Sequence, residues 1–231
     1  MSKATDKSVM RVMAVLLSGF ALGAFLIFGN TAREPVIENG GGNGTGELAI
    51  VVLEQLEVKG RAPKTGYTRE EFYKSWGKIG SCDARNVILK RDMWEVELDG
   101  CNVLSGKLND PYTGKLIEFV RGPGTSSAVQ IDHVVAISDA WQKGAQNLSK
   151  DDRYKLSQDP LNLLAVDGPV NQAKGDSDAA SWLPPNTTFR CEYVARQIAV
   201  KQKYVLWVTS AEKDAMKKVL AKCPEERLLT E

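Results

Sequence analysis

The chain has 231 residues, of which 43% are hydrophobic and 26% are charged. This composition is that of an ordinary globular protein and excludes a disordered chain, and the length allows one compact domain plus an N-terminal extension. The formal net charge is +1, and because residues 1–32 carry +2, the remainder carries −1. A protein that holds nucleic acid by bulk charge is usually clearly basic, so the composition argues against that mode and leaves a local basic patch and a metal as the sources of contact.

The N-terminus has the pattern of an export signal. Lys3, Lys7 and Arg11 precede an uninterrupted apolar or small run of 17 residues, from Val12 to Phe28. For residues 1–32 this predicts either a cleaved signal peptide or a retained membrane anchor with a cytoplasmic N-terminus. A buried core helix is the alternative, which the lack of a polar face disfavours.

A glycine-rich linker follows the apolar run. Residues 33–46 include the run Asn39-Gly-Gly-Gly-Asn-Gly-Thr-Gly46, which is typical of a flexible connection. We therefore expect residues 47–231 to form a single domain. That domain would be secreted, or held on the outer face of the cell membrane by residues 12–28.

The four cysteines support export. They include no CxxC pair and the chain has a single histidine, so a structural zinc site is disfavoured. An even number of cysteines in an exported chain predicts two disulfides. Three pairings are possible, and we favour Cys82–Cys101 with Cys191–Cys223, each within its own half of the domain. Buried reduced thiols are the alternative.

Helical patterns dominate the first part of the domain. Residues 47–58 place apolar side chains on one face, and residues 83–92 predict a second helix. Between them, Thr68 and Glu71 have the spacing of a capping box, in which a hydroxyl and a carboxylate satisfy backbone N–H groups at a helix start.

Alternating apolar residues then predict strands, followed by helices towards the C-terminus. Pro169 suits the first turn of a helix, and Thr209 with Glu212 forms a second capping box. The expected strands are 94–98, 101–108, 116–121, 129–135 and 161–166, and the expected helical segments are 138–148, 151–156, a helix from about 169, a long helix from 186 or 187 to 204, and one after 209.

The single histidine, His133, lies among other polar residues at strand ends. Asp132 precedes it, Asn162 lies near the start of the strand at 161–166, and the following helix carries Asn171. Neighbouring residues on a strand point to opposite faces, so Asp132 and His133 can serve one site only if the strand end is twisted or bulged.

These residue types suit hydrolysis of a phosphodiester. The reaction needs a base near neutral pH, and an imidazole has a suitable pKa. It also needs a cation near the phosphate, and the oxygens of Asp132 and Asn171 suit Mg²⁺ or Mn²⁺.

Three segments together resemble a known family. Ile131-Asp-His-Val-Val135, Asn162 and Asn171-Gln-Ala-Lys-Gly-Asp176 resemble the HNH endonucleases, most of all the GmrSD-type HNH domain found in many exported bacterial proteins. The resemblance implies an α+β fold with a ββα-metal core over about residues 129–178, flanking helices and a small antiparallel sheet.

The resemblance also implies residue roles. Asp132 and Asn171 would bind one divalent cation, Mg²⁺ or Mn²⁺. His133 would be the general base, Asn162 would organise the loop, and Lys174 would lie near the substrate phosphate. On the residue types alone, Asn171 as a simple polar residue in a first helical turn is the alternative, and Lys174 as a solvated lysine is another.

The function expected from this resemblance is an exported, metal-dependent endonuclease. Its substrate would be DNA, with RNA remaining open, and little sequence specificity is expected because no recognition helix or basic arm is evident. No protein partner is evident. Candidates to line a phosphate groove are Arg121, Arg85, Arg91 and Lys143.

Two other functions remain as alternatives. The first is a noncatalytic cell-surface binding domain on a nuclease-like fold, which the complete set of Asp132, His133 and Asn171 disfavours. The second is a serine hydrolase that uses His133, which the absence of a Gly-x-Ser-x-Gly motif disfavours.

Overall fold

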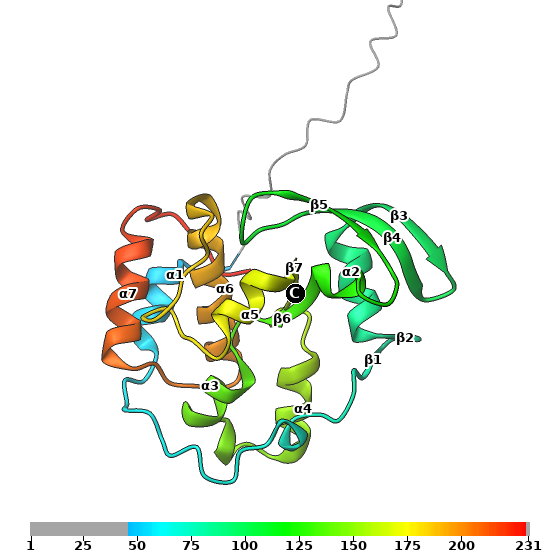
Figure 1. Cartoon of the computed structure of the whole chain (residues 1–231). Coiled ribbons are helices and arrows are strands. Elements are labelled where there is room, and N and C mark those ends of the chain that lie inside the picture. The colour runs from blue at the N-terminus through cyan, green and yellow to red at the C-terminus, as the bar shows by residue number, and fades with distance from the viewer. Residues whose placement is uncertain (1–45, 230–231) are drawn as a thin grey trace, which may run out of the picture. The chain divides into compact units, whose positions relative to one another are not determined.

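The computed structural model describes residues 46–229, so the predicted signal or anchor segment and all but the last residue of the linker lie outside the described part. As expected, the fold is of the α+β class (Figure 1). The helices are α1 (Ala49–Gln55), α2 (Ala84–Asp92), α3 (Ile137–Gln142), α4 (Lys150–Gln158), α5 (Gly168–Lys174), α6 (Arg190–Lys203) and α7 (Ser210–Leu220), and the strands are β1 (Lys78–Ile79), β2 (Cys82–Asp83), β3 (Trp94–Asp99), β4 (Asn102–Asn109), β5 (Leu116–Val120), β6 (Val129–His133) and β7 (Leu163–Asp167).

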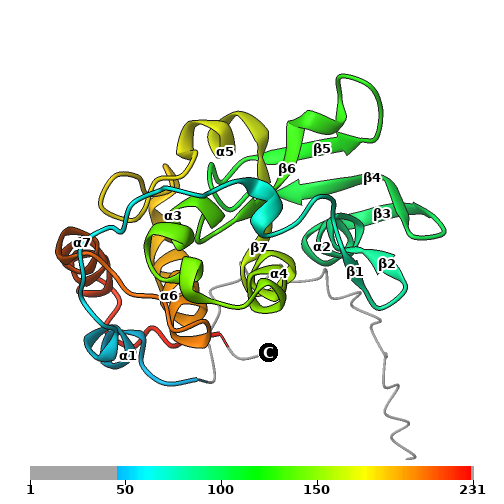
Figure 2. The ribbon, with the colours of Figure 1, turned by 90° about the horizontal axis from the view of Figure 1, so that it is seen from below.

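The strands form three small antiparallel sheets. β1 pairs with β2, β4 lies between β3 and β5, and β6 pairs with β7. Figure 1 and Figure 2 show the β6–β7 strand pair in the middle, with the three-stranded sheet and α2 on one side and α1, α6 and α7 on the other.

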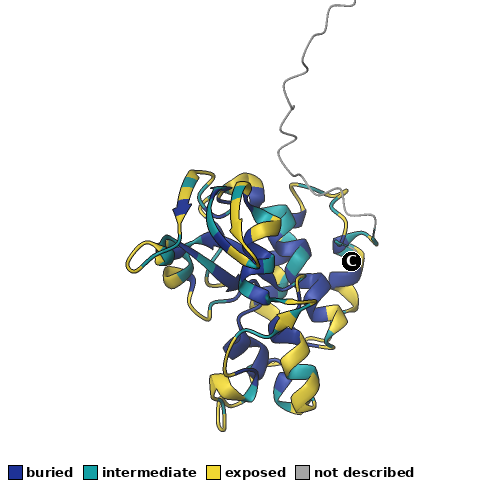
Figure 3. Ribbon diagram, turned by 90° about the vertical axis from the view of Figure 1, so that its right-hand side faces the viewer, coloured by how far each residue is buried: buried dark blue, intermediate teal, exposed yellow. Residues whose placement is uncertain are grey.

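The antiparallel pair of β6 and β7 is buried on both faces. On one face, Ile131 and Ala165 belong to the core that α2 and the three-stranded sheet build. On the other, Leu164 and Val166 belong to the core shared with α1, α6 and α7. Two-sided burial explains why this part of the sequence is almost continuously apolar rather than alternating. Figure 3 shows the outer helices buried on one side and exposed on the other, as expected for helices that cover a core.

Two helix starts follow local capping chemistry. The Asp83 side chain accepts a hydrogen bond from the backbone N–H of Asn86 at the start of α2. Thr209 and Glu212 form the predicted capping box of α7.

The predicted capping box at Thr68 is wrong. Only one 3₁₀ turn, Arg69–Glu71, follows Thr68, and the Thr68 side chain makes no capping bond. The Glu71 carboxylate accepts a hydrogen bond from Arg153 of α4 instead, at 3.1 Å. The Glu71 carboxylate is therefore used in a long-range ion pair instead of in a helix cap.

Some predicted elements are shorter than expected. The helix expected over residues 47–58 is confined to α1. The segment expected over residues 138–148 divides into α3 and a 3₁₀ turn at Ala145–Asn147, because Gly144 between them has φ 123°, outside the helical region.

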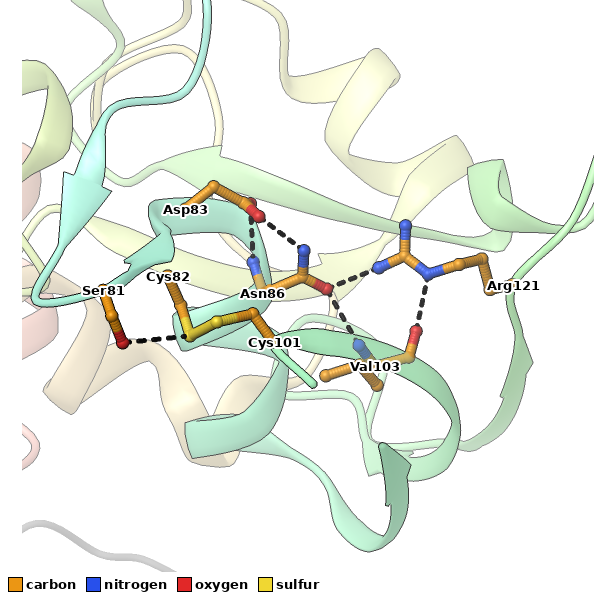
Figure 4. Close-up of a disulfide and its surroundings, with 7 residues drawn as sticks. All are labelled: Ser81, Cys82, Asp83, Asn86, Cys101, Val103 and Arg121. Atoms are coloured by element: carbon orange, nitrogen blue, oxygen red, sulfur yellow. Dashed lines mark hydrogen bonds between the residues drawn. A yellow bond between two sulfur atoms is a disulfide. The ribbon is translucent and has the colours of Figure 1, made fainter. Parts of the chain in front are cut away.

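Both disulfides of the favoured pairing are present. Cys82 of β2 bonds to Cys101 at the turn before β4, and Cys191 of α6 bonds to Cys223 beyond α7. Figure 4 shows the first of these. Disulfides of this kind fit an extracellular location. Within residues 46–229, none of the helices has the length and apolar character needed to cross a membrane.

A buried ionic cluster joins α3, α6, α7 and two loops. The Lys143 ammonium lies 2.9 Å from Asp139, 2.7 Å from Asp178 and 2.7 Å from Glu212. Lys201 pairs with Glu212 at 3.1 Å. Arg61, outside the buried group, reaches Asp139 and Asp178 from the surface. Lys143 is thus structural, and the expectation that it lines a phosphate groove is wrong.

Replacement of Lys143 should destabilise the fold. Lys143→Met leaves three buried carboxylates with fewer cations, and breaking a buried pair on one side typically costs about 3–5 kcal/mol. Urea unfolding followed by circular dichroism measures the change in the free energy of unfolding.

The matched control is Lys222→Met, because Lys222 is an exposed lysine just beyond α7. Such surface changes usually stay within about 0.5 kcal/mol. Equal unfolding free energies for the two variants would show that the cluster contributes nothing to stability.

Candidate active site

The site is built on a ββα unit formed by β6, β7 and α5. The chain turns from β7 directly into α5, where the Asp167 side chain accepts a hydrogen bond from the backbone N–H of Val170 at 2.8 Å. Pro169 lies in the first helical turn, as predicted. A Cβ at Gly168 would collide with the carbonyl oxygen of Ser127, so this position requires glycine.

A cavity of about 410 Å³ lies at this unit, and Asp132, His133 and Asn171 all line it. Residues far apart in the sequence therefore meet at one place. The cavity walls also include Tyr67, Arg69, Tyr73, Trp76, Arg85, Gln130, Ile131, Ala136, Ile137, Ser138, Gly175 and Asp176.

Asp132 and His133 reach this cavity without a bulge. The pairing of β6 with β7 continues without a register shift from Val129 to His133. Of the two expected alternatives, a twist or a bulge at the strand end, the bulge is therefore absent. Asp132 shares the strand face of Gln130, and His133 lies on the other face at the last residue of the strand, so the cavity extends across the strand end.

The Asp132 carboxylate is buried and bonded to two protein groups. Oδ1 accepts a hydrogen bond from the Lys174 ammonium at 2.9 Å, and Oδ2 accepts one from the Tyr112 hydroxyl. Burial raises the pKa of Asp132 because it disfavours the charged form, and Lys174 and Tyr112 oppose that effect. Each carboxylate oxygen keeps a second lone pair for a further partner.

The His133 imidazole is held in one orientation. Its Nε2 lies 2.9 Å from the carbonyl oxygen of Ser157. A carbonyl only accepts, so Nε2 carries the proton and Nδ1 carries the lone pair of the neutral ring. The Trp76 ring stacks on the imidazole with a centroid separation of 5.7 Å. Burial lowers the pKa of His133 to about 4, so the ring is neutral at physiological pH.

Asn171 faces the cavity from α5. Its Nδ2 donates to Gln130 Oε1 at 3.0 Å, which leaves its Oδ1 for another partner. The hydrogen bond ties the helix to the strand face that carries Asp132. Asp176, just beyond α5, accepts from Ser138 at 3.0 Å and pairs with Lys64.

Asn162 is fully buried and bonds to two other segments. Its Oδ1 accepts from the backbone N–H of Val135 at 2.8 Å, and its Nδ2 donates to the carbonyl oxygens of Val135 and Leu156. These bonds join the loop after β6 to the end of α4 at the start of β7. This geometry supports the expectation that Asn162 organises the loop.

Lys174 is buried and is not among the residues that line the cavity. Its ammonium donates to Asp132 and to the carbonyl oxygen of His133, both at 2.9 Å. It therefore lies next to the carboxylate rather than on the cavity wall that a phosphate would contact.

Of the arginines expected in a phosphate groove, only Arg85 lines the cavity. Arg121 donates to Asn86 and to the carbonyl oxygen of Val103, as Figure 4 shows. Arg91 pairs with Asp92 and donates to carbonyl oxygens near β7. The guanidinium groups of Arg121 and Arg91 are thus used in hydrogen bonds and ion pairs within the domain.

Several cavity residues were not identified from the sequence. Arg69 donates to the Tyr73 hydroxyl, and Tyr73 stacks on Trp76 at 5.3 Å. These three residues lie within eight positions of one another, so a local cluster of aromatic and cationic residues was the available signal. Tyr112 lies in a turn far from Asp132 in the sequence, and no local pattern indicated its role.

The donor set fits a hard divalent cation with few protein ligands. Asp132 and Asn171 each offer an oxygen at one cavity, and Mg²⁺ usually binds through one or two carboxylates with water and phosphate completing its shell. Among the described residues, three histidine, cysteine or acidic donor atoms come together only at Cys191, Cys223 and Glu226, where both sulfurs form a disulfide.

An antiparallel pair of strands followed at once by a helix, with a histidine ending the first strand, defines a nuclease-like ββα fold. The family model for the C-terminal domain of GmrSD restriction endonucleases matches residues 83–219, and the chain belongs to this family. The chain is also 40% identical over 176 residues to an Arthroderma benhamiae protein named "Uncharacterized secreted protein", a match that covers 74% of this chain and 83% of the relative.

Replacement of Asn162 should destabilise the site and the domain together. Asn162→Ala leaves the buried N–H of Val135 and two carbonyl oxygens without their partner, and each unsatisfied buried group costs about 1–3 kcal/mol. Chemical unfolding should show a loss of about 2–4 kcal/mol.

Asn147→Ala is the matched control, because Asn147 is exposed in the 3₁₀ turn after α3. A loss for Asn162→Ala no greater than that of the control would contradict the structural role of Asn162.

Proposed function

We propose that this protein is an exported, metal-dependent endonuclease that hydrolyses phosphodiester bonds of DNA, with RNA as a further possible substrate. The observation that carries the proposal is that Asp132, His133 and Asn171 line one cavity at a ββα unit. Membership of the GmrSD C-terminal domain family supports it.

His133 acts as the general base. Its Nδ1 takes a proton from the attacking water, while the Nε2–H remains bonded to the Ser157 carbonyl and keeps the ring in place. The low pKa keeps the ring in its basic, neutral form before the reaction.

Asp132 and Asn171 hold one divalent cation, Mg²⁺ or Mn²⁺. When bound, that ion would stabilise the negative charge on the phosphate and on the departing oxygen. Lys174 and Tyr112 fix the orientation of the Asp132 carboxylate, so Lys174 acts here as a positioning residue. Asn162 holds the loop that follows His133.

Arg85 and Arg69 are the cationic side chains on the cavity wall. Arg85 Nη2 donates to the carbonyl oxygens of Ser126 and Val129, and Arg69 Nη1 donates to the Tyr73 hydroxyl. Their other N–H groups therefore bind the substrate phosphates. Contacts to phosphates carry no sequence information. Little sequence specificity is therefore expected.

The protein acts outside the cytoplasm. The two disulfides and the secreted relative support this location. Residues 1–32 would be a signal peptide or a membrane anchor, residues 33–46 a linker and residues 47–231 the nuclease domain.

A noncatalytic binding domain on the same fold is the second candidate. It is favoured by one observation, that protein groups already bond to both oxygens of Asp132. In that case Asp132 would serve only to neutralise Lys174, and the purified protein would bind nucleic acid without cleaving it.

Replacement of His133 should remove catalysis and leave metal binding intact. Loss of a general base typically lowers the rate about 10²–10⁴-fold, so His133→Ala should nick supercoiled plasmid at that reduced rate in Mg²⁺ or Mn²⁺. Wild-type nicking should stop with EDTA. Nicking that survives chelation would rule out the metal mechanism, and nicking unaffected by His133→Ala would rule out the base.

Replacement of either proposed ligand should weaken metal binding. Even mutations beyond the direct ligands often cost about 10–100-fold in metal affinity, so Asn171→Ala and Asp132→Asn should each weaken Mn²⁺ binding at least about tenfold by calorimetry. Asn171→Ala is the cleaner variant because Asn171 is only partly buried.

Asp214→Asn, at an exposed acidic residue of α7, is the control. Thermal unfolding of each variant separates a lost ligand from a misfolded protein. Unchanged Mn²⁺ affinity in both ligand variants would show that the assignment of Asp132 and Asn171 is wrong.

A further inference from the structure

A second cavity adjoins the candidate active site. Its volume is about 690 Å³, and it lies between the segment before β1 and the start of α4. Its walls include Tyr73, Trp76, Lys74, Lys78, Lys150 and Tyr154. We call it the lysine groove.

The lysine groove and the active-site cavity share two residues, Tyr73 and Trp76. These rings stack on each other, and both lie within 6 Å of the His133 ring by centroid separation, at 5.6 Å and 5.7 Å. The two cavities therefore border each other at these two rings, next to His133.

The lysine groove combines cations with an exposed aromatic ring. Lys74, Lys78 and Lys150 line it against two acidic residues, in a chain whose overall charge is only +1. The Tyr154 side chain is 42% exposed there, so part of the ring is accessible to a ligand.

Gly77 leaves room for the Tyr154 ring. A Cβ at Gly77 would collide with the Tyr154 hydroxyl, so the absence of a side chain at Gly77 lets Tyr154 approach the wall. The backbone N–H of Gly77 donates to Gln158 of the same helix at 2.7 Å, which fixes the two segments together.

We propose that the lysine groove binds the nucleotide next to the scissile phosphate in a single strand of nucleic acid. The base stacks on Tyr154, and the lysines contact the phosphates. This inference rests on the proposed nuclease function and names its preferred substrate as single-stranded.

Two arguments favour a single strand over a duplex. Aromatic side chains bind base faces, which a duplex covers by its own stacking and an unpaired strand exposes. Tight binding of a duplex backbone needs many phosphate contacts, whereas the lysine groove offers three lysines against Glu70 and Asp151, with Lys74 paired to Glu70 at 3.7 Å, and the whole chain carries only +1.

Direct binding tests the proposal. Fluorescence anisotropy of a short labelled oligodeoxythymidylate, with EDTA present to prevent cleavage, reports the affinity of the full chain. Stacking on one aromatic side chain is worth at least about 1 kcal/mol, so Tyr154→Ala should raise the Kd at least about fivefold. Trp94→Ala is the matched control, because Trp94 is 39% exposed on β3 and lines neither cavity.

A charge reversal tests the phosphate contacts independently. Lys78→Glu should weaken binding more at low salt than at high salt, because contacts to phosphates release counterions. Lys222→Glu makes the same charge change at an exposed site away from the lysine groove and should have a much smaller effect.

The outcomes separate this inference from the nuclease function. If Tyr154→Ala and Lys78→Glu bind like their controls while wild-type protein nicks DNA, the lysine groove is not a binding site and the nuclease function stands. If both variants lose affinity but the wild type cleaves nothing, the lysine groove stands and the nuclease function fails. Equal affinity of the wild type for single strand and matched duplex, or no affinity for either, overturns the preference for a single strand.

Discussion

The candidate site depends on one electrostatic requirement, the neutralisation of Asp132. Because Asp132 is only 5% exposed, water solvates this carboxylate poorly, and an unpaired buried charge is strongly destabilising. Lys174 supplies the compensating charge and Tyr112 an additional donor. The same ion pair holds α5 against β6, so the position of Asn171 follows from the pairing of Asp132.

Burial has a different consequence one residue later. His133 is an uncharged base that needs no counterion, and burial keeps it neutral by lowering its pKa. The Ser157 carbonyl selects the tautomer, and the Trp76 ring restricts the imidazole. Burial of Asp132 is thus compensated by an ion pair, whereas burial of His133 is tolerated because its ring is neutral. Both side chains reach the same cavity although they lie on opposite faces of the strand.

Local patterns in the sequence predicted the elements that local chemistry determines. Pro169 and Thr209 mark helix starts correctly because their effects act within one turn, and the sole histidine indicated where to search for a site. Arg69 was missed although it lies in a local cluster with Tyr73 and Trp76, and Tyr112 was missed because it reaches Asp132 only through the tertiary fold. The capping box at Thr68 failed for the same reason, because Glu71 pairs with Arg153 of a distant helix.

Net charge is a poor guide to this protein because much of its charge is internal. Lys143 and Lys201 are fully buried and form ion pairs with carboxylates of the ionic cluster, and Lys174 forms an ion pair with Asp132. These three lysines lie against four carboxylates, Asp132, Asp139, Asp178 and Glu212, so the buried groups carry a negative excess that the remaining residues offset. The net charge also does not record where on the surface the remaining charges lie. A near-neutral chain can therefore present a local basic groove, and the composition argument excludes only a broad basic surface.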